Sequence, residues 1–151
     1  MAHSLFFEDF EVGQSFESGG RTIMETDLTF FSMLSGDWNP IHADAEFAKN
    51  TRFGQRVVHG TLGIAIATGM LHEMGIFHES AVAMMSLNQW KFVAPILVGD
   101  TLHLRLEITE LDPGKSERVG RLGRRFAMLN QRDDIVQDGL SDLLIKKRGA
   151  R

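Results

Sequence analysis

The sequence contains no cysteine, only three prolines and no long apolar run. Without cysteine the chain can form no disulfide, thiolate nucleophile or cysteine-ligated zinc site. No segment reaches the roughly 20 apolar residues that span a bilayer. The first ten residues contain two acids instead of the apolar stretch of a signal peptide. We therefore expect a cytoplasmic protein without membrane contact.

Positive charge is also scarce. The chain carries 16 Lys and Arg against 20 Asp and Glu, and its only basic cluster is KKRGAR at the C-terminus. It lacks the basic surface that binds a phosphate backbone, so we expect no nucleic-acid partner. The length of 151 residues and the hydrophobic content of 43% predict one globular domain over residues 1–151. The last residues, 147–151, are expected to form a flexible tail.

The segment HGTLGIAIATGMLHEMG predicts a helix with Thr61 as its N-cap and Gly75 as its stop. Its apolar side chains cover nearly the whole circumference, which is typical of a helix that is buried on all sides. A helix of about 14 residues is about 21 Å long, which suits a domain core better than a membrane. We expect this helix to form the centre of the fold.

The C-terminal half changes to a period of two. Residues 101–109 alternate strictly and place Leu102, Leu104, Leu106 and Ile108 on one face. Strands are also predicted at residues 15–24, 84–93, 118–130 and 135–146. Consecutive antiparallel strands that follow one apolar helix predict the α+β class, with a sheet curled around the helix.

Two short helical segments flank the stretch SGDWNPIHADAEF. The first is predicted to run from Thr26 as N-cap to Gly36 as stop, and the second to cover residues 44–49 with Asp44 as its cap. The residues between them are irregular, and irregular surface segments commonly carry functional side chains.

Asp37 and His42 stand five residues apart around the turn of Asn39 and Pro40. Proline restricts the preceding residue to extended backbone, so the chain can double back and bring the two side chains together. An acid and an imidazole that share a water can add it to a polarised double bond, or catalyse the reverse elimination. The spacing alone equally allows a structural role, in which Asp37 caps a turn and His42 bonds to the backbone.

Polarisation of a carbonyl requires a hydrogen-bond donor, and Gly60 at the start of the apolar helix is the candidate. A helix N-terminus presents free N–H groups, and glycine lets a substrate approach closely, so its N–H can form an oxyanion hole. His59 is interpreted as a packed or hydrogen-bonded supporting residue and not as a base. We expect no metal site, because Asp37, His42 and His59 lack a familiar ligand spacing.

The sequence SGDWNPIHADAEFAKNTRFGQRVVHGTLGIAIATGML, together with FVAPILVGDTL, resembles the hydratase-2 motif of the MaoC-like (R)-specific enoyl-CoA hydratases. The resemblance implies a single hot-dog domain that forms a homodimer or a higher homo-oligomer. It also implies that Asp37 and His42 are catalytic, that Asn39 supports them and that Gly60 binds the thioester oxygen. Thr68 stands where members of the family have a serine that lines the site.

The function implied by the resemblance is reversible hydration of trans-2-enoyl-CoA to (R)-3-hydroxyacyl-CoA. No metal or redox cofactor is implied, and CoA is part of the substrate. A hot-dog acyl-CoA thioesterase is an alternative, although such enzymes commonly use an acid from the central helix, and this helix is apolar until Glu73. A non-catalytic acyl-CoA-binding accessory protein is a second alternative. Branched or dicarboxylic acyl groups and carrier-protein thioesters remain open as substrates.

Overall fold

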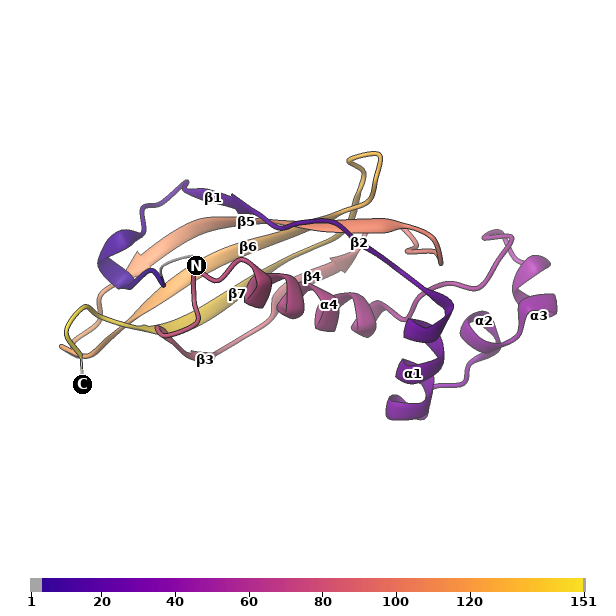
Figure 1. The fold of residues 1–151 in the computed structure, drawn as a ribbon, viewed down its shortest axis with the longest axis horizontal. Helices are drawn as coiled ribbons and strands as arrows, with labels where there is room; N and C mark the ends of the chain where they lie inside the picture. Colours follow the sequence, from indigo (N-terminus) through magenta and orange to yellow (C-terminus); the bar gives the residue numbers. More distant parts are fainter. Residues whose placement is uncertain (1–3, 151) are drawn as a thin grey trace.

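The computed structural model describes residues 4–150 and has one antiparallel sheet and one long helix (Figure 1). The strands are β1 (Ser15–Glu17), β2 (Arg21–Thr22), β3 (Ala81–Met84), β4 (Asn88–Phe92), β5 (Thr101–Asp112), β6 (Val119–Leu129) and β7 (Ile135–Lys146). Their order is β1-β5-β6-β7-β3, with β2 also paired to β5 and β4 also paired to β7. The predicted α+β class is confirmed.

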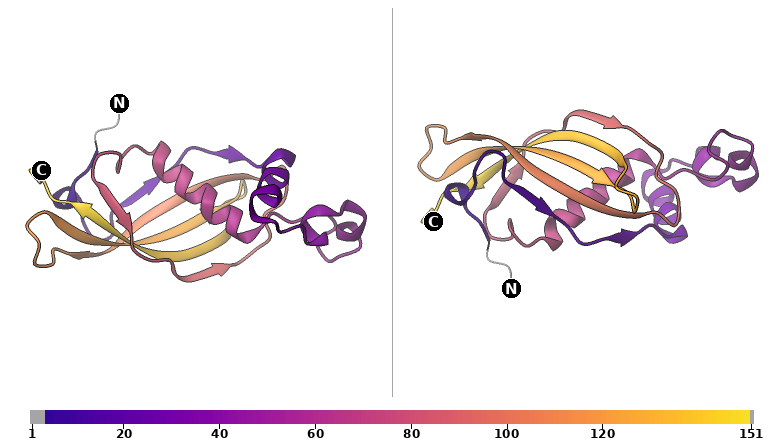
Figure 2. Two further views of the ribbon diagram at one scale, coloured as in Figure 1. Left: turned by 90° about the horizontal axis from the view of Figure 1, so that it is seen from below. Right: turned by 90° about the horizontal axis from the view of Figure 1, so that it is seen from above.

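The helices are η1 (Phe7–Asp9), α1 (Glu25–Ser35), α2 (Pro40–Ala43), α3 (Ala45–Lys49) and α4 (Gly60–Glu73). Helix α4 crosses one face of the sheet, as Figure 2 shows. Over residues 4–150, no helix combines the length and the apolar character that crossing a membrane requires.

The core forms between α4 and the inner face of the sheet. Leu62, Ile66 and Met70 of α4 are buried in one cluster with the alternating apolar residues of β5. The predicted alternation in β5 is correct, because all four of its inner residues from Leu102 to Ile108 are fully buried. Each such side chain stabilises the fold by about 1.5–3 kcal/mol relative to exposure.

The expectation that α4 is buried on all sides is wrong for this chain. Thr61, Ala65, Gly69 and His72 are exposed on the side of α4 that faces away from the sheet. A single sheet layer covers only one side of a helix, so the opposite apolar side remains open. The predicted N-cap was also misplaced, because the N-cap of α4 is His59 and not Thr61.

Two strands predicted as continuous are interrupted. The stretch 84–93 is divided between β3 and β4, which both pair with β7. The register shifts within each of these pairings, and Gln89 has a positive φ of 49°. The stretch 15–24 is similarly divided into β1 and β2. The long strands β6 and β7 match their predicted bounds to within one residue at each end.

Helices α1, α2 and α3 form an overhanging segment that lies beyond the end of the sheet (Figure 1). Gly36 ends α1 in the left-handed conformation at φ 75°, as predicted. The N-cap of α1 is Met24 instead of Thr26, and the Asp27 carboxylate accepts a hydrogen bond from the Met24 N–H. Only Leu28 and Ser32 of α1 are buried, so this segment adds little to the core.

Lys147 and Arg148, the first two residues after β7, contact other parts of the domain. The Lys147 ammonium donates to the carbonyls of Pro113 and Ser116, and Arg148 pairs with Asp9. The first residues of the basic cluster are therefore bound by backbone carbonyls and by an acid. The positive charge of the cluster did not predict these partners. Arg151 lies outside the described residues.

Candidate active site

Asp37 follows the end of α1, and its carboxylate organises the turn that leads to α2. One carboxylate oxygen accepts from the Asn39 N–H at 3.1 Å, and the Asn39 side-chain oxygen accepts from the Ile41 N–H at 3.1 Å. Pro40 occupies the first position of α2, where its missing N–H costs nothing. This turn places His42 in the last turn of a four-residue helix, which the sequence interpretation had missed.

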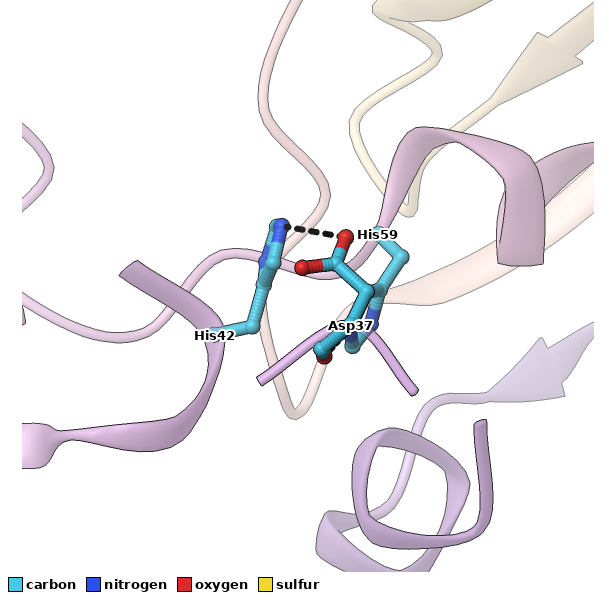
Figure 3. Close-up of side chains that lie close together, drawn as sticks. All are labelled: Asp37, His42 and His59. Carbon is cyan, nitrogen blue, oxygen red and sulfur yellow. Dashed lines mark hydrogen bonds and ion pairs between the residues drawn. The ribbon is translucent and has the colours of Figure 1, made fainter. Parts of the chain in front are cut away.

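The ring of His42 is oriented by the backbone of the strand-like segment before α4. The Val57 carbonyl can only accept, so the His42 Nδ1 donates to it over 2.6 Å. In the neutral imidazole the remaining Nε2 therefore carries a lone pair. That Nε2 lies 3.9 Å from the Oδ2 of Asp37 (Figure 3). This is too long for a direct hydrogen bond and leaves room for one water to contact both groups.

His59 lies beneath this pair and is only 1% exposed. Its ring stacks on the His42 ring, with the centroids 3.9 Å apart and the planes inclined by 24°. Its Nε2 donates to the Asp37 carbonyl at 3.0 Å and lies 3.3 Å from the Ser32 hydroxyl. His59 thus fixes the backbone of one member of the pair and the ring of the other. Ser32 was not singled out from the sequence, although it is a polar residue on the inward face of α1.

Asp37, His42 and His59 could each offer one ligand atom to a metal, and these atoms lie within 4.8 Å of one another. The stacked arrangement is unfavourable for such a site. Imidazole lone pairs lie in the ring plane, so two nearly parallel rings direct them side by side and not toward one ion. The geometry suits proton transfer better than coordination.

Gly60 begins α4 directly after His59, and its N–H belongs to the first turn, where no earlier helical carbonyl can accept it. The ring of Phe92 packs over this glycine, and an added Cβ would lie 2.6 Å from the Phe92 Cε1. The Gly60 carbonyl accepts from the Gln137 amide at 3.0 Å, and Gln137 accepts from the Trp90 indole at 3.1 Å. The helix start is therefore anchored to β7 and β4.

These elements enclose one cavity of about 480 Å³. It brings together Asp37, His42, His59 and Gly60 from the overhanging segment and the start of α4. The cavity has the Asp37 carboxylate and the His42 imidazole on one side and a helix N-terminus on the other. Such an arrangement can hold a carbonyl compound and exchange protons with it.

A family model described as MaoC like domain matches residues 9–126. The chain belongs to this family. It is 36% identical to the (R)-specific enoyl-CoA hydratase of Rhodospirillum rubrum over 144 residues, which cover 95% of this chain and 94% of that protein. It is 31% identical to the 3-hydroxybutyryl-CoA dehydratase of Methylorubrum extorquens, with 95% and 86% covered. The MaoC-like chain is thus similar to hydratases and dehydratases that act on CoA thioesters.

The comparison with solved structures identifies the fold. A Mycobacterium tuberculosis protein described as having a double hot-dog fold superposes with a TM-score of 0.85, at 20% identity. The match covers 98% of the MaoC-like chain and 46% of that protein. The expected hot-dog fold is confirmed.

Not every residue singled out in the MaoC-like sequence lines the cavity that contains Asp37 and His42. The Asn39 side chain acts through the turn and does not line the cavity. Thr68 lines a different hollow, two helical turns further along α4, and its hydroxyl donates to the Ala65 carbonyl at 2.7 Å. Arg52 and Phe53 do line the cavity and were not predicted, because they lie in a loop without a recognisable pattern.

Proposed function

We propose that this protein catalyses the reversible hydration of trans-2-enoyl-CoA to (R)-3-hydroxyacyl-CoA. The observation that carries the proposal is the position of the His42 Nε2, which faces the Asp37 carboxylate at 3.9 Å inside the cavity that contains Gly60. The similarity to proteins named hydratase and dehydratase supports the same reaction class.

In the proposed reaction, the thioester oxygen accepts a hydrogen bond from the Gly60 N–H. This interaction draws electrons from the double bond, makes C3 electrophilic and stabilises the enolate-like transition state. A donor of this kind contributes about 10²–10³ in rate in other enzymes. The dipole of α4 acts in the same direction because its positive end lies at Gly60.

Water held between Asp37 and His42 supplies the atoms that are added. Its oxygen bonds to C3 while the pair accepts one proton from it, and the pair delivers one proton to C2. The pair therefore returns to its starting protonation state after each turnover, and the reverse sequence dehydrates the hydroxyacyl product. The reaction balances with water alone, so we propose that no metal or redox cofactor takes part and that CoA enters only within the substrate.

We further propose that two copies of the chain form a homodimer over the open side of α4. Strands β3 and β4 carry exposed apolar side chains beside it, including Val82, Met84 and Phe92. A contiguous apolar surface of this kind commonly marks an interface. Light scattering after size exclusion tests this, and Val82→Glu should shift the mass from two chains toward one. A single-chain mass for the wild type would contradict the proposal.

The activity is tested by the loss of enoyl-thioester ultraviolet absorbance with crotonyl-CoA and a longer trans-2-enoyl-CoA. Chiral analysis of the product should give the (R)-3-hydroxyacyl-CoA. Release of free CoA would instead support a thioesterase, although Glu73, the only acid of α4, does not line the catalytic cavity. Acyl-CoA binding without any turnover would support a non-catalytic accessory protein.

A further inference from the structure

The cavity that contains the proposed catalytic pair also contains a cation that the proposed hydration does not use. Arg52 lies in the loop between α3 and α4 and lines the same cavity as Asp37, His42 and Gly60. Within the described part of the chain, it is the only lysine or arginine among the lining residues. The proposed steps use a backbone N–H and a pair that exchanges protons, whereas a guanidinium stays protonated. The role of Arg52 therefore lies outside the proton transfers.

Arg52 has no acidic partner of its own. No carboxylate lies within ion-pair distance of its guanidinium among residues 4–150. Asp37 lines the same cavity but is not paired with it, so the cation does not serve to neutralise the proposed catalytic carboxylate. The next arginine in the loop, Arg56, pairs instead with Glu25 of α1. The charge of Arg52 is thus available to a ligand in the cavity.

The loop that carries Arg52 is fixed near both of its ends. At its start, the Thr51 hydroxyl donates to the Ala48 carbonyl of α3 at 2.7 Å. Near its end, the Val57 N–H donates to the Ile41 carbonyl of α2 at 3.1 Å, and the Val57 carbonyl accepts from the proposed catalytic imidazole. The loop is therefore tied to the short helix that carries this imidazole, so the cation and the reacting groups keep a defined relative position.

An aromatic neighbour restrains the Arg52 side chain. The guanidinium carbon lies 4.7 Å from the centroid of the Phe53 ring, which is half-buried and also lines the cavity. A ring face attracts the cation but offers no oxygen as an acceptor, so the N–H groups remain available. Two adjacent N–H groups of a guanidinium match the two oxygens of a carboxylate.

We propose that the protein acts on enoyl thioesters whose acyl group carries a second carboxylate, and that Arg52 binds this carboxylate. The inference rests on the proposed function and names its substrate class. Arg52 shares one cavity of about 480 Å³ with Gly60, the proposed donor to the thioester oxygen. The phosphates of CoA are separated from the thioester by the whole pantetheine arm, whereas the second carboxylate of a short acyl group is only a few bonds away. The position of Arg52 therefore favours the acyl carboxylate.

The remaining wall of the cavity fits the same substrate class. Its apolar part can contact the hydrocarbon of a short acyl group and consists of Val57, Val58, Val93, Ala94, Pro95 and Ile96. The negative charge of Asp37 disfavours a second carboxylate in the cavity unless a cation offsets it. Arg52 supplies that cation, and a neutral acyl group would need none.

The first experiment measures affinity without turnover. Isothermal titration calorimetry compares glutaryl-CoA with pentanoyl-CoA, which have acyl chains of equal length and no double bond to hydrate. The wild type should bind glutaryl-CoA about tenfold more tightly, as expected for a hydrogen bond between charged groups. Arg52→Met should remove this preference and Arg52→Lys should retain part of it. The matched control is Arg56→Met in the same loop, which should keep the preference because Arg56 lines a different hollow.

The second experiment compares kcat/KM for trans-glutaconyl-CoA and trans-2-pentenoyl-CoA, which differ in the same carboxylate. Water adds to C3 of either substrate, so the proposed chemistry is the same. Arg52→Met should lower the ratio of dicarboxylic to monocarboxylic kcat/KM about tenfold. Arg56→Met should leave this ratio unchanged.

Three results would overturn the proposal. The first is equal wild-type affinity for the two saturated thioesters, or no binding of either. The second is a preference for glutaryl-CoA that persists in Arg52→Met. The third is an equal loss of affinity for both thioesters in Arg52→Met, which would assign Arg52 to the CoA moiety. If the wild type prefers glutaryl-CoA through Arg52 but hydrates neither enoyl thioester, the proposed function fails and the carboxylate site remains. Arg52→Met is expected to fold, because the arginine is exposed and has no ion pair to lose among residues 4–150.

Discussion

Replacing the proposed catalytic pair separates chemistry from stability. Asp37→Asn keeps an oxygen that can accept from the Asn39 N–H, and the Asp37 side chain is 52% exposed. We expect its free energy of unfolding to change by less than about 1 kcal/mol. His42→Ala loses the hydrogen bond to the Val57 carbonyl and the stacking on His59. We expect a cost of about 1–2 kcal/mol, or a few degrees in Tm.

The effect on catalysis should be far larger. General acid–base groups contribute about 10²–10⁴ each, so either single variant should lower kcat by that amount, equivalent to about 3–5 kcal/mol. If both groups hold one water, as the 3.9 Å separation suggests, they act as a unit. The double variant should then lose little more activity than the less active of the two single variants.

The assay is the initial rate of enoyl-thioester absorbance loss, with Tm and circular dichroism recorded on the same preparations. Two results would refute the reasoning. Near wild-type rates in both single variants would mean that the pair is structural, as the sequence alone allowed. A double variant whose loss is the product of the two single losses would mean that Asp37 and His42 act independently and do not share a water.

Three further changes test the surroundings of the pair. Gly60→Pro removes the proposed donor and should lower kcat by about 10²–10³. Gly60→Ala keeps the N–H but forces the Phe92 ring to move, so it should mainly cost about 1–3 kcal/mol of stability. Equal activity losses in the two variants would argue against a donor role for Gly60. Gln137→Leu leaves the Trp90 N–H without its acceptor and removes the side-chain hydrogen bond to the Gly60 carbonyl, which keeps its partner within α4. It should cost about 1–3 kcal/mol in urea unfolding, so an unchanged midpoint would contradict the anchoring role. A backbone N–H lowers the pKa of Asp9 below its usual value. The stability that this carboxylate adds is therefore present above the unfolded pKa of about 4 and is lost as pH falls through the folded pKa. Asp9→Asn should lower Tm at neutral pH but not in acid, and a Tm difference from the wild type that persists at pH 2 would contradict this expectation.

The sequence predicts the long strands of this fold well and the breaks between its short strands poorly. The strict alternation from Leu102 to Ile108 indicates the strand and its inner face, because period-two burial leaves a direct signature in residue type. The break between β3 and β4 leaves no such signature, because the register shifts depend on pairing with β7, which is distant in sequence. The exposed side of α4 was mispredicted for a similar reason, since composition cannot tell which chain covers an apolar surface.

The candidate site also has parts that the sequence predicts and parts that it does not. The turn at Asn39 and Pro40 and the stop at Gly36 follow from local chemistry, and both lead directly to the convergence of Asp37 and His42. The bond from His42 to the Val57 carbonyl spans 15 residues, and the bond from Ser32 to His59 spans 27. These contacts depend on how the overhanging segment folds against the start of α4, which no short motif encodes.

The proposed catalytic pair and the proposed donor belong to parts of the molecule that differ in local stability. Gly60 starts the helix that anchors the core, whereas Asp37 and His42 belong to a segment with few buried residues outside the sheet. Local opening of that segment therefore costs less than global unfolding. Hydrogen exchange should reveal amides at residues 25–49 exchanging well before those of β5 and β6. A denaturant concentration should exist at which the sheet and α4 are intact and the reaction has stopped, so inactivation would precede unfolding.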